Sequence, residues 1–243
     1  MNKQKFAVVI PARFQSSRFP GKPLVDLCGK PMIEHVWERC CQAVGTDKVY
    51  VATDNNEIED AVKGFGGQVI RTSSSCLTGT DRLAEANRTL DCDFIINVQG
   101  DEPLINPADI NTVVQTYLNG DGSVVNAMCE IKDEQEFKSF TVPKVVCDQS
   151  GKLLYMSRSS IPLTKDGEFK SAFKQVCIYA FSKEHLEFFL SHQTKTPLEL
   201  IEDIEILRFL ESSYRVKMIE VESGSIAIDV PADVERVIKV LKK

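Results

Sequence analysis

FAVVIPARFQSSRFPGKPL, residues 6–24, decides the fold because an apolar run leads directly into a basic loop. The run Phe6–Ile10 is hydrophobic without alternation, as in a parallel strand that is covered on both faces. We expect Pro11 to end this strand at the carboxyl edge of an open α/β sheet, where ligands bind in such folds. The position of the loop therefore favours a ligand-binding role.

The loop after Pro11 has the composition of a polyphosphate cradle. Its cations, hydroxyls and tight-turn glycine are Arg13, Arg18, Lys22, Ser16, Ser17 and Gly21. Arginine can bind two phosphate oxygens at once, lysine acts as a point charge, and hydroxyl and backbone N–H groups add donors. A solvated basic turn has the same composition, so this stretch alone leaves both interpretations open.

The chain as a whole is acidic. Its 243 residues are 43% hydrophobic and 26% charged, with a formal net charge of −6. This charge argues against nucleic acid or an anionic membrane as a partner, so the basic loop should bind a small anion. No apolar stretch reaches the roughly 20 residues that span a bilayer, and no signal-peptide core follows the N-terminus, which predicts a cytoplasmic protein. The 8 cysteines show no CxxC spacing and are expected to be reduced.

Alternating strand and helix patterns predict an α/β fold. The elements expected up to residue 118 are strands 6–10, 48–53, 68–71 and 93–98 and helices 31–44, 56–64, 80–90 and 107–118. Strand-like runs and a hairpin turn at 148–151 then indicate a smaller antiparallel region. The elements expected to complete the pattern are a helix at 198–211, strands 215–221 and 226–229, and a final amphipathic helix. We therefore expect a mostly parallel Rossmann-like sheet covered by helices.

Two aspartates follow expected strands that are far apart in the sequence. Asp101 comes after the apolar strand 94–98, and Asp229 ends the strand 226–228 before Pro231 begins a helix. Carboxylates from two strands can hold Mg²⁺ while leaving positions for phosphate and water. Each aspartate could instead cap a turn or a helix, and for Asp229 that helix is the one beginning at Pro231.

Segments spread over the whole chain resemble one enzyme family. They are IPAR-x4-R-x-PGKPL (10–24), GKPMI (29–33), VATD (51–54), TGTDRL (78–83), NVQGDEPLI (97–105), LLYMSR (153–158), TPLELIEDIEILR (196–208) and IDVPADVERV (228–237). Their order and spread resemble the CMP-Kdo synthetases, which are 3-deoxy-manno-octulosonate (Kdo) cytidylyltransferases. The opening lacks the GxGxR-type glycine run that is typical of hexose-1-phosphate nucleotidyltransferases.

The resemblance implies in-line attack by the anomeric hydroxyl of Kdo on the α-phosphorus of CTP, with Mg²⁺ and without a covalent intermediate. It implies catalytic roles for Lys22, Arg13 and Asp101, and a metal site at Asp101 and Asp229. The implied nucleotide-binding residues are Pro11, Ala12, Arg13, Ser16, Lys22, Thr78, Gly79, Thr80, Arg82 and Gln99. Thr80 could also serve as the N-cap of the helix that follows it.

On the acceptor side, the resemblance implies contacts from Arg18, Gln99, Arg158, Gln175, Tyr179 and Glu205. Two positions depart from the pattern of Kdo-specific members, because Gln175 stands in place of a histidine and Ile206 in place of a glutamine. The lost sugar contacts leave an amino-substituted Kdo or a sialate-like acid open as the acceptor. A CTP-binding regulator without catalysis is the alternative from a different functional class.

The resemblance also implies a division of the chain. Residues 1–122 and 195–243 would form the nucleotide-binding core, and residues 123–194 a smaller region for acceptor binding and homodimer contacts. Within the expected helix 198–211, we expect the acids other than Glu205 to form a solvated face, and Leu200 and Ile201 to lie on the apolar side.

Overall fold

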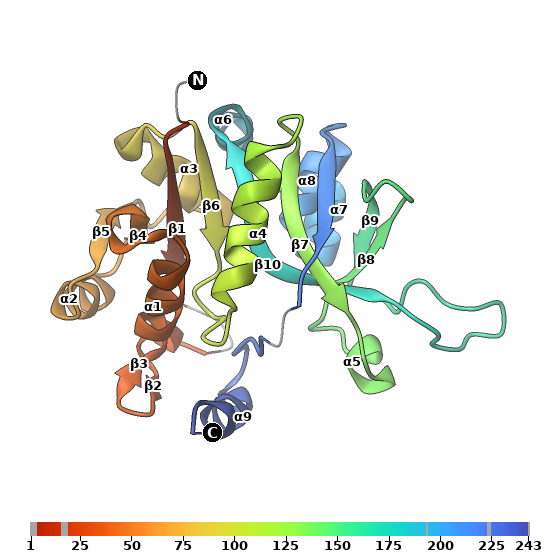
Figure 1. Cartoon of the computed structure of the whole chain (residues 1–243), viewed down its shortest axis with the longest axis horizontal. Helices are drawn as coiled ribbons and strands as arrows, with labels where there is room; N and C mark the ends of the chain where they lie inside the picture. Colours follow the sequence, from red (N-terminus) through yellow and green to blue (C-terminus); the bar gives the residue numbers. More distant parts are fainter. Residues whose placement is uncertain (1–3, 16–18, 193, 223–224, 243) are drawn as a thin grey trace.

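The computed structural model describes residues 4–15, 19–192, 194–222 and 225–242. These residues form a nine-stranded sheet with helices on both faces (Figure 1). The strands are β1 (Phe6–Ala12), β4 (Val49–Thr53), β5 (Gln68–Arg71), β6 (Phe94–Val98), β7 (Val124–Glu130), β8 (Lys144–Cys147), β9 (Leu153–Ser157), β10 (Phe173–Ser182) and β11 (Val216–Glu220), with β2 (Asp26–Leu27) and β3 (Lys30–Pro31) in a small separate hairpin. The helices are α1 (Met32–Val44), α2 (Asn56–Gly64), α3 (Gly79–Leu90), α4 (Pro107–Leu118), α5 (Glu134–Lys138), α6 (Lys183–Ser191), α7 (Pro197–Glu202), α8 (Ile206–Glu211) and α9 (Pro231–Leu241), with 3-10 turns at Lys22–Leu24 and Thr46–Lys48.

The main sheet has the order β11-β7-β10-β6-β1-β4-β5. Strands β6, β1, β4 and β5 pair in parallel, and so do β11 and β7. Strand β10 runs antiparallel between β6 and β7, and the β8–β9 hairpin pairs with β10 through β8. The prediction of a mostly parallel α/β sheet covered by helices is confirmed, and β10 is the reversed strand that joins its two parallel parts.

Each face of the sheet is buried under its own set of helices. Helices α1, α2 and α4 pack on one face, and α3, α6 and α8 on the other. Strand β1 contributes side chains to the hydrophobic core on each face of the sheet. Val8 and Ile10 lie in the core under α1, α2 and α4, and Ala7 and Val9 in the core under α3, α6 and α8. All four side chains are at most 2% exposed. The unbroken apolar run therefore reflects burial on both sides of the strand.

Strand β1 is longer than expected, and the prediction that Pro11 ends it was wrong. Pro11 and Ala12 continue the strand, paired with Ala52 and Thr53 of β4. On the other side, pairing with β6 stops at Val9. A proline, which has no N–H to donate, fits here because the strand has a neighbour on one side only at this point.

The expected helix 198–211 is in fact two short helices, α7 and α8. They flank Asp203, whose φ of 51° lies in the left-handed region. The break turns Glu199 and Arg208 toward each other, and this fully buried pair is joined at 2.7 Å. The prediction of a solvated acidic face was therefore wrong for Glu199. It was also wrong for the apolar side, because Leu200 and Ile201 are 67% and 77% exposed.

The segment expected as strand 226–229 has no strand structure. The backbone N–H of Ile228 donates a hydrogen bond to the carbonyl of Asp101 at 2.9 Å, which holds the segment against the edge of the sheet. Ile228 packs with α9 and the β2–β3 hairpin in a separate small core. The N-cap of α9 is Val230 and not Asp229, and the backbone N–H groups of Asp229 and Val230 both donate to the carboxylate of Asp233.

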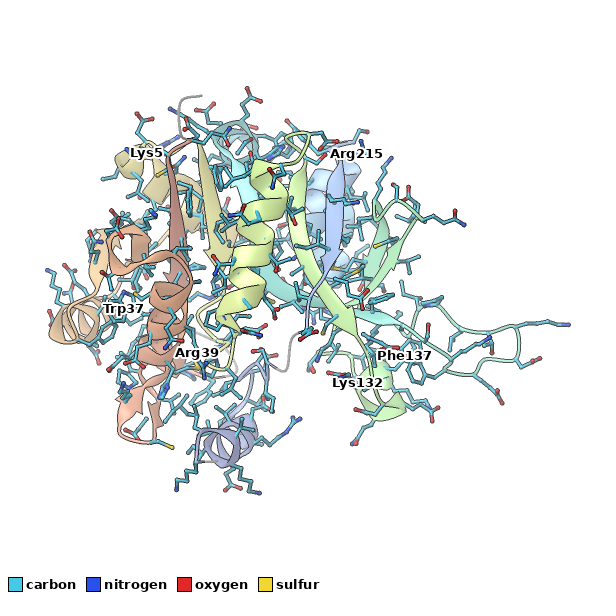
Figure 2. The ribbon with its side chains drawn as sticks, viewed as in Figure 1. Lys5, Trp37, Arg39, Lys132, Phe137 and Arg215 are labelled. Atoms are coloured by element: carbon cyan, nitrogen blue, oxygen red, sulfur yellow. The ribbon has the colours of Figure 1, made fainter. Side chains whose placement is uncertain are left out.

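The range 123–194 contributes both to the main sheet and to structures beside it. Strands β7 and β10 belong to the main sheet, whereas α5 and the long loop 158–172 project at one end (Figure 1). Phe137 of α5 lies beside the base of this loop, as Figure 2 shows, and its ring is 4.7 Å from that of Phe169. The division into a core and an acceptor region stays a prediction. No helix in the part of the chain that is described is long and apolar enough to cross a membrane.

Candidate active site

Two adjoining pockets lie at the carboxyl edge of β1 and β6. Their volumes are about 210 Å³ and about 920 Å³. The residues that line both are Gln99, Asp101, Asp203, Glu205 and Asp229. These side chains form a shared wall, so ligands in the two pockets would meet there.

The smaller pocket gathers the residues that the sequence predicts for the nucleotide. Those that line it are Pro11, Ala12, Arg13, Lys22, Thr78, Gly79, Arg82 and Gln99. Thr80 is only 2% exposed and is not part of the lining. Ser16, predicted for the nucleotide, and Arg18, predicted for the acceptor, lie outside the described residues.

Lys22 and the two aspartates predicted for the metal come together at the shared wall. Lys22 Nζ donates to Asp101 Oδ2 at 2.8 Å and lies 4.0 Å from Asp229 Oδ1. Each aspartate side chain is 27% exposed, so its oxygens are open to a ligand as well as to Lys22. The described residues contain no group of three His, Cys, Asp or Glu side chains that could hold a metal ion. The carboxylate pair offers the hard oxygens that a divalent cation such as Mg²⁺ prefers.

The N-terminus of α3 is closed by two carboxylates. Thr78, not Thr80, is the N-cap, and Thr78 and Asp81 form a reciprocal capping box. Glu205 accepts hydrogen bonds from the backbone N–H groups of Gly79 and Thr80, both at 3.0 Å, and from the Thr80 hydroxyl at 2.5 Å. Burial raises the pKa of Glu205, and the bonds from Thr80 and Gly79 oppose this rise. Glu205 thus joins the shared wall to the nucleotide side, 125 residues away in sequence.

The two arginines that line the smaller pocket differ in burial and in their bonding to the protein. Arg82 is 3% exposed. Its guanidinium donates to Thr72 Oγ1 at 2.5 Å and lies 3.4 Å from Asp54 Oδ1, so it stiffens the pocket wall. Arg13 is exposed. Lys195, which was not among the predicted residues, adds another cation to the lining.

The larger pocket gathers the residues predicted for the acceptor. Those that line it are Gln99, Arg158, Gln175, Tyr179 and Glu205. The Arg158 guanidinium donates to the backbone carbonyls of Phe140, Glu202 and Asp203, so it holds the pocket rim together. Ile206 is 1% exposed and packs in the core beneath α8, outside the pocket lining.

Two further groups in the larger pocket were not among the predicted residues. Glu102 is 6% exposed. Its position directly after Asp101, a predicted site residue, is the feature of the sequence that could have identified it. Burial raises its pKa, while a hydrogen bond from Ser225 opposes the rise. Burial also raises the pKa of the Cys177 thiol and of Tyr179 well above their usual ranges. The pocket therefore has protonated, neutral Cys177 and Tyr179 side chains near Glu102.

Comparisons with known proteins place the chain in a family. The family described as Cytidylyltransferase matches residues 7–219. The 3-deoxy-manno-octulosonate cytidylyltransferase of Geobacter metallireducens is 41% identical over 98% of this chain and 98% of its own. That of Geotalea uraniireducens is 44% identical over 98% of this chain and 100% of its own. A solved structure of CMP:2-keto-3-deoxy-manno-octonic acid synthetase complexed with CTP has a TM-score of 0.89 and 38% identity, and 98% of each chain is covered. The chain belongs to the 3-deoxy-manno-octulosonate cytidylyltransferase family.

Proposed function

We propose that this chain transfers the cytidylyl group of CTP to the anomeric hydroxyl of Kdo, giving CMP-Kdo for lipopolysaccharide or capsule synthesis. The observation that supports this most strongly is the wall shared by the two pockets. CTP in the smaller pocket and the sugar in the larger pocket would meet beside Asp101 and Gln99. The hydroxyl loses its proton to solvent and its oxygen bonds to the α-phosphorus, the bond from that phosphorus to the bridging oxygen breaks, and pyrophosphate leaves.

The chain's own cations lower the charge that this attack meets. Lys22 and Arg13 neutralise the phosphate oxygens, and Ser16 belongs to the same proposed nucleotide set. Thr78 and Gly79 line the same pocket at the N-terminus of α3 and belong to the proposed nucleotide set as well. Because Lys22 already contacts Asp101, phosphate binding would divide its charge between the two.

Asp101 and Asp229 are the residues that would hold Mg²⁺. They fit it because both are partly exposed carboxylates directed at one point, now marked by Lys22 Nζ. A bound Mg²⁺ would supply further neutralisation of the departing pyrophosphate. Asp101 also accepts a hydrogen bond from Lys22, so Asp101 has the further role of positioning the Lys22 ammonium group.

The acceptor set of this proposal is Arg18, Gln99, Arg158, Gln175, Tyr179 and Glu205. In the lining of the larger pocket, acidic side chains outnumber basic ones. Since Kdo is itself an anion, this excess favours an amino-substituted Kdo as a second candidate, because an ammonium group would be attracted to the acids.

A homodimer in the cytoplasm completes the proposal. Large apolar side chains stand exposed on β9, on α7 and before β8: Leu154, Leu200, Ile201 and Phe140. Arg158 donates to the carbonyls of Phe140 and Glu202, so the chain segments that carry Phe140 and Ile201 lie close together. Exposed apolar patches of this kind mark interfaces. Sedimentation of the wild type and of Ile201→Lys tests the dimer, which the substitution should dissociate.

The test of the activity is pyrophosphate release from CTP and Mg²⁺, with Kdo, 8-amino-Kdo and N-acetylneuraminate supplied in parallel. Turnover that is fastest with Kdo supports the proposal. Turnover with another acid alone shows a changed acceptor specificity. Binding of CTP without pyrophosphate release in the presence of any of these acceptors would instead support a regulator.

A further inference from the structure

Strand β10 carries a two-residue bulge where it borders the larger pocket. Val176 is opposite Ala127 of β7, but the next paired residue, Tyr179, is opposite Asn126. Two residues of β10 therefore have no partner on β7. Bulges leave backbone groups unpaired, and buried unpaired groups are costly, so these carbonyls need other donors.

One side chain supplies those donors. Asn126 Nδ2 donates to the carbonyls of Val176 and Ile178, both at 3.0 Å, and Asn126 is 0% exposed. The carbonyl between them, that of Cys177, accepts from the backbone N–H of Gln99 at 3.2 Å. The bulge is thus held by Asn126 on one side and by the shared wall of the pockets on the other.

These bonds fix the orientation of Gln175. Both protons of Asn126 Nδ2 are used, so its Oδ1 must accept. Gln175 Nε2 donates to that oxygen at 3.0 Å, which identifies the amide end that faces Asn126. No described residue donates to Gln175 Oε1, and Gln175 lines the larger pocket.

We infer that Asn126 is a positioning residue that holds Gln175 with its carbonyl oxygen free to accept a hydrogen bond from the acceptor sugar. The sugar group recognised there is a donor, either a hydroxyl or an ammonium. This inference rests on the proposed function. It assigns acceptor selection to a pair of amides on β7 and β10 rather than to Gln175 alone.

The experiment measures KM for Kdo and for CTP in the wild type, Gln175→Met, Asn126→Ala and the double variant. Each single variant should raise the KM for Kdo about five- to ten-fold, the loss expected for one neutral hydrogen bond, and leave the KM for CTP unchanged. In the double variant, Asn126→Ala should add less than two-fold, because its effect acts through Gln175.

Two further variants separate positioning from folding. Asn87 is a buried asparagine whose side chain bonds the backbone of Cys92, away from both pockets, so Asn87→Ala should reduce stability without changing either KM. Gln175→Glu keeps Asn126 and the bulge but replaces the Nε2 donor with an oxygen that faces Asn126 Oδ1, so the hydrogen bond between the two side chains is lost. This variant should raise the KM for Kdo, and it provides a test even if Asn126→Ala does not fold.

Additive effects in the double variant, or an equal rise in the KM for CTP, would overturn the positioning role. An unchanged KM for Kdo in Gln175→Met and Gln175→Glu would do the same. Failure of the proposed function looks different, because then the wild type itself releases no pyrophosphate with any acceptor, and the recognition of a sugar by this pair is refuted with it.

Discussion

Substituting Glu205 by glutamine should separate its effect on stability from its effect on CTP binding. The carboxylate accepts three hydrogen bonds from Gly79 and Thr80. Glutamine retains one oxygen and turns an NH₂ group toward at least one of these donors. An unsatisfied donor costs about 1–3 kcal/mol, and loss of a negative charge at a helix N-terminus costs about 0.3–1 kcal/mol. We expect Glu205→Gln to lose about 1–4 kcal/mol and roughly 3–15 °C in Tm.

Glu211 offers a matched control at another helix. Its carboxylate accepts from the Thr196 hydroxyl and from the backbone N–H groups of Leu198 and Glu199 at the start of α7, and it lines neither pocket described here. Glu211→Gln should therefore lower Tm by a similar amount.

The kinetic assay then distinguishes the two variants. Because Thr78 and Gly79 line the smaller pocket, Glu205→Gln should raise the KM for CTP about ten-fold, whereas Glu211→Gln should leave it unchanged. Equal KM values for CTP in the two variants would refute the idea that Glu205 shapes the nucleotide site. A Tm unchanged in Glu205→Gln would refute the hydrogen-bond argument itself.

Three further predictions concern the shared wall and the pH dependence of stability. Lys22→Ala should raise the KM for CTP and lower kcat, because a cation is lost from the phosphate site; near-normal kinetics would contradict this role. Asp101→Asn should abolish turnover with only a modest loss of CTP affinity in equilibrium binding, and normal turnover would exclude the role. Burial lowers the pKa of His185 from 6.5 to about 4, and its Nδ1 accepts the Ser182 N–H, so stability should be complete above about pH 6.5 and fall by about 2 kcal/mol at pH 5. Urea unfolding of His185→Gln, which keeps an acceptor in the capping box, should show a smaller loss between pH 7 and 5, and an equal loss would point to other groups.

The elements with strong local signals could be predicted from the sequence. Helix α4 begins at Pro107 and ends at Leu118, as expected, because proline suits a first helical turn and the apolar residues recur with helical spacing. The apolar run Phe6–Ile10 predicted a strand that is buried on both faces, and β1 is such a strand. Only the end of β1 differed, because the pairing of Pro11 depends on where β6 stops.

The region after residue 195 could not be predicted from local pattern, because distant partners determine it. A row of acids beside apolar residues looks the same whether it faces solvent or Arg208. The break at Asp203 lets Glu199 form an ion pair with Arg208 and lets Glu205 accept hydrogen bonds at the N-terminus of α3. Likewise, Asn126 has no motif of its own, and its importance comes from a bulge on another strand.

The reversed strand β10 explains how one sheet separates the two halves of the site. β1 leads to the nucleotide loop, and β6 lies beside it and is followed directly by Gln99, in the shared wall. β10 then places Gln175 and Tyr179 on the far side of β6, next to Asn126 of β7. Changes on β7 and β10 can therefore alter the sugar that is accepted while leaving the strand before the phosphate loop untouched. The departure from the family pattern at Gln175 lies on the acceptor side of that boundary, so its consequence should be confined to the acceptor.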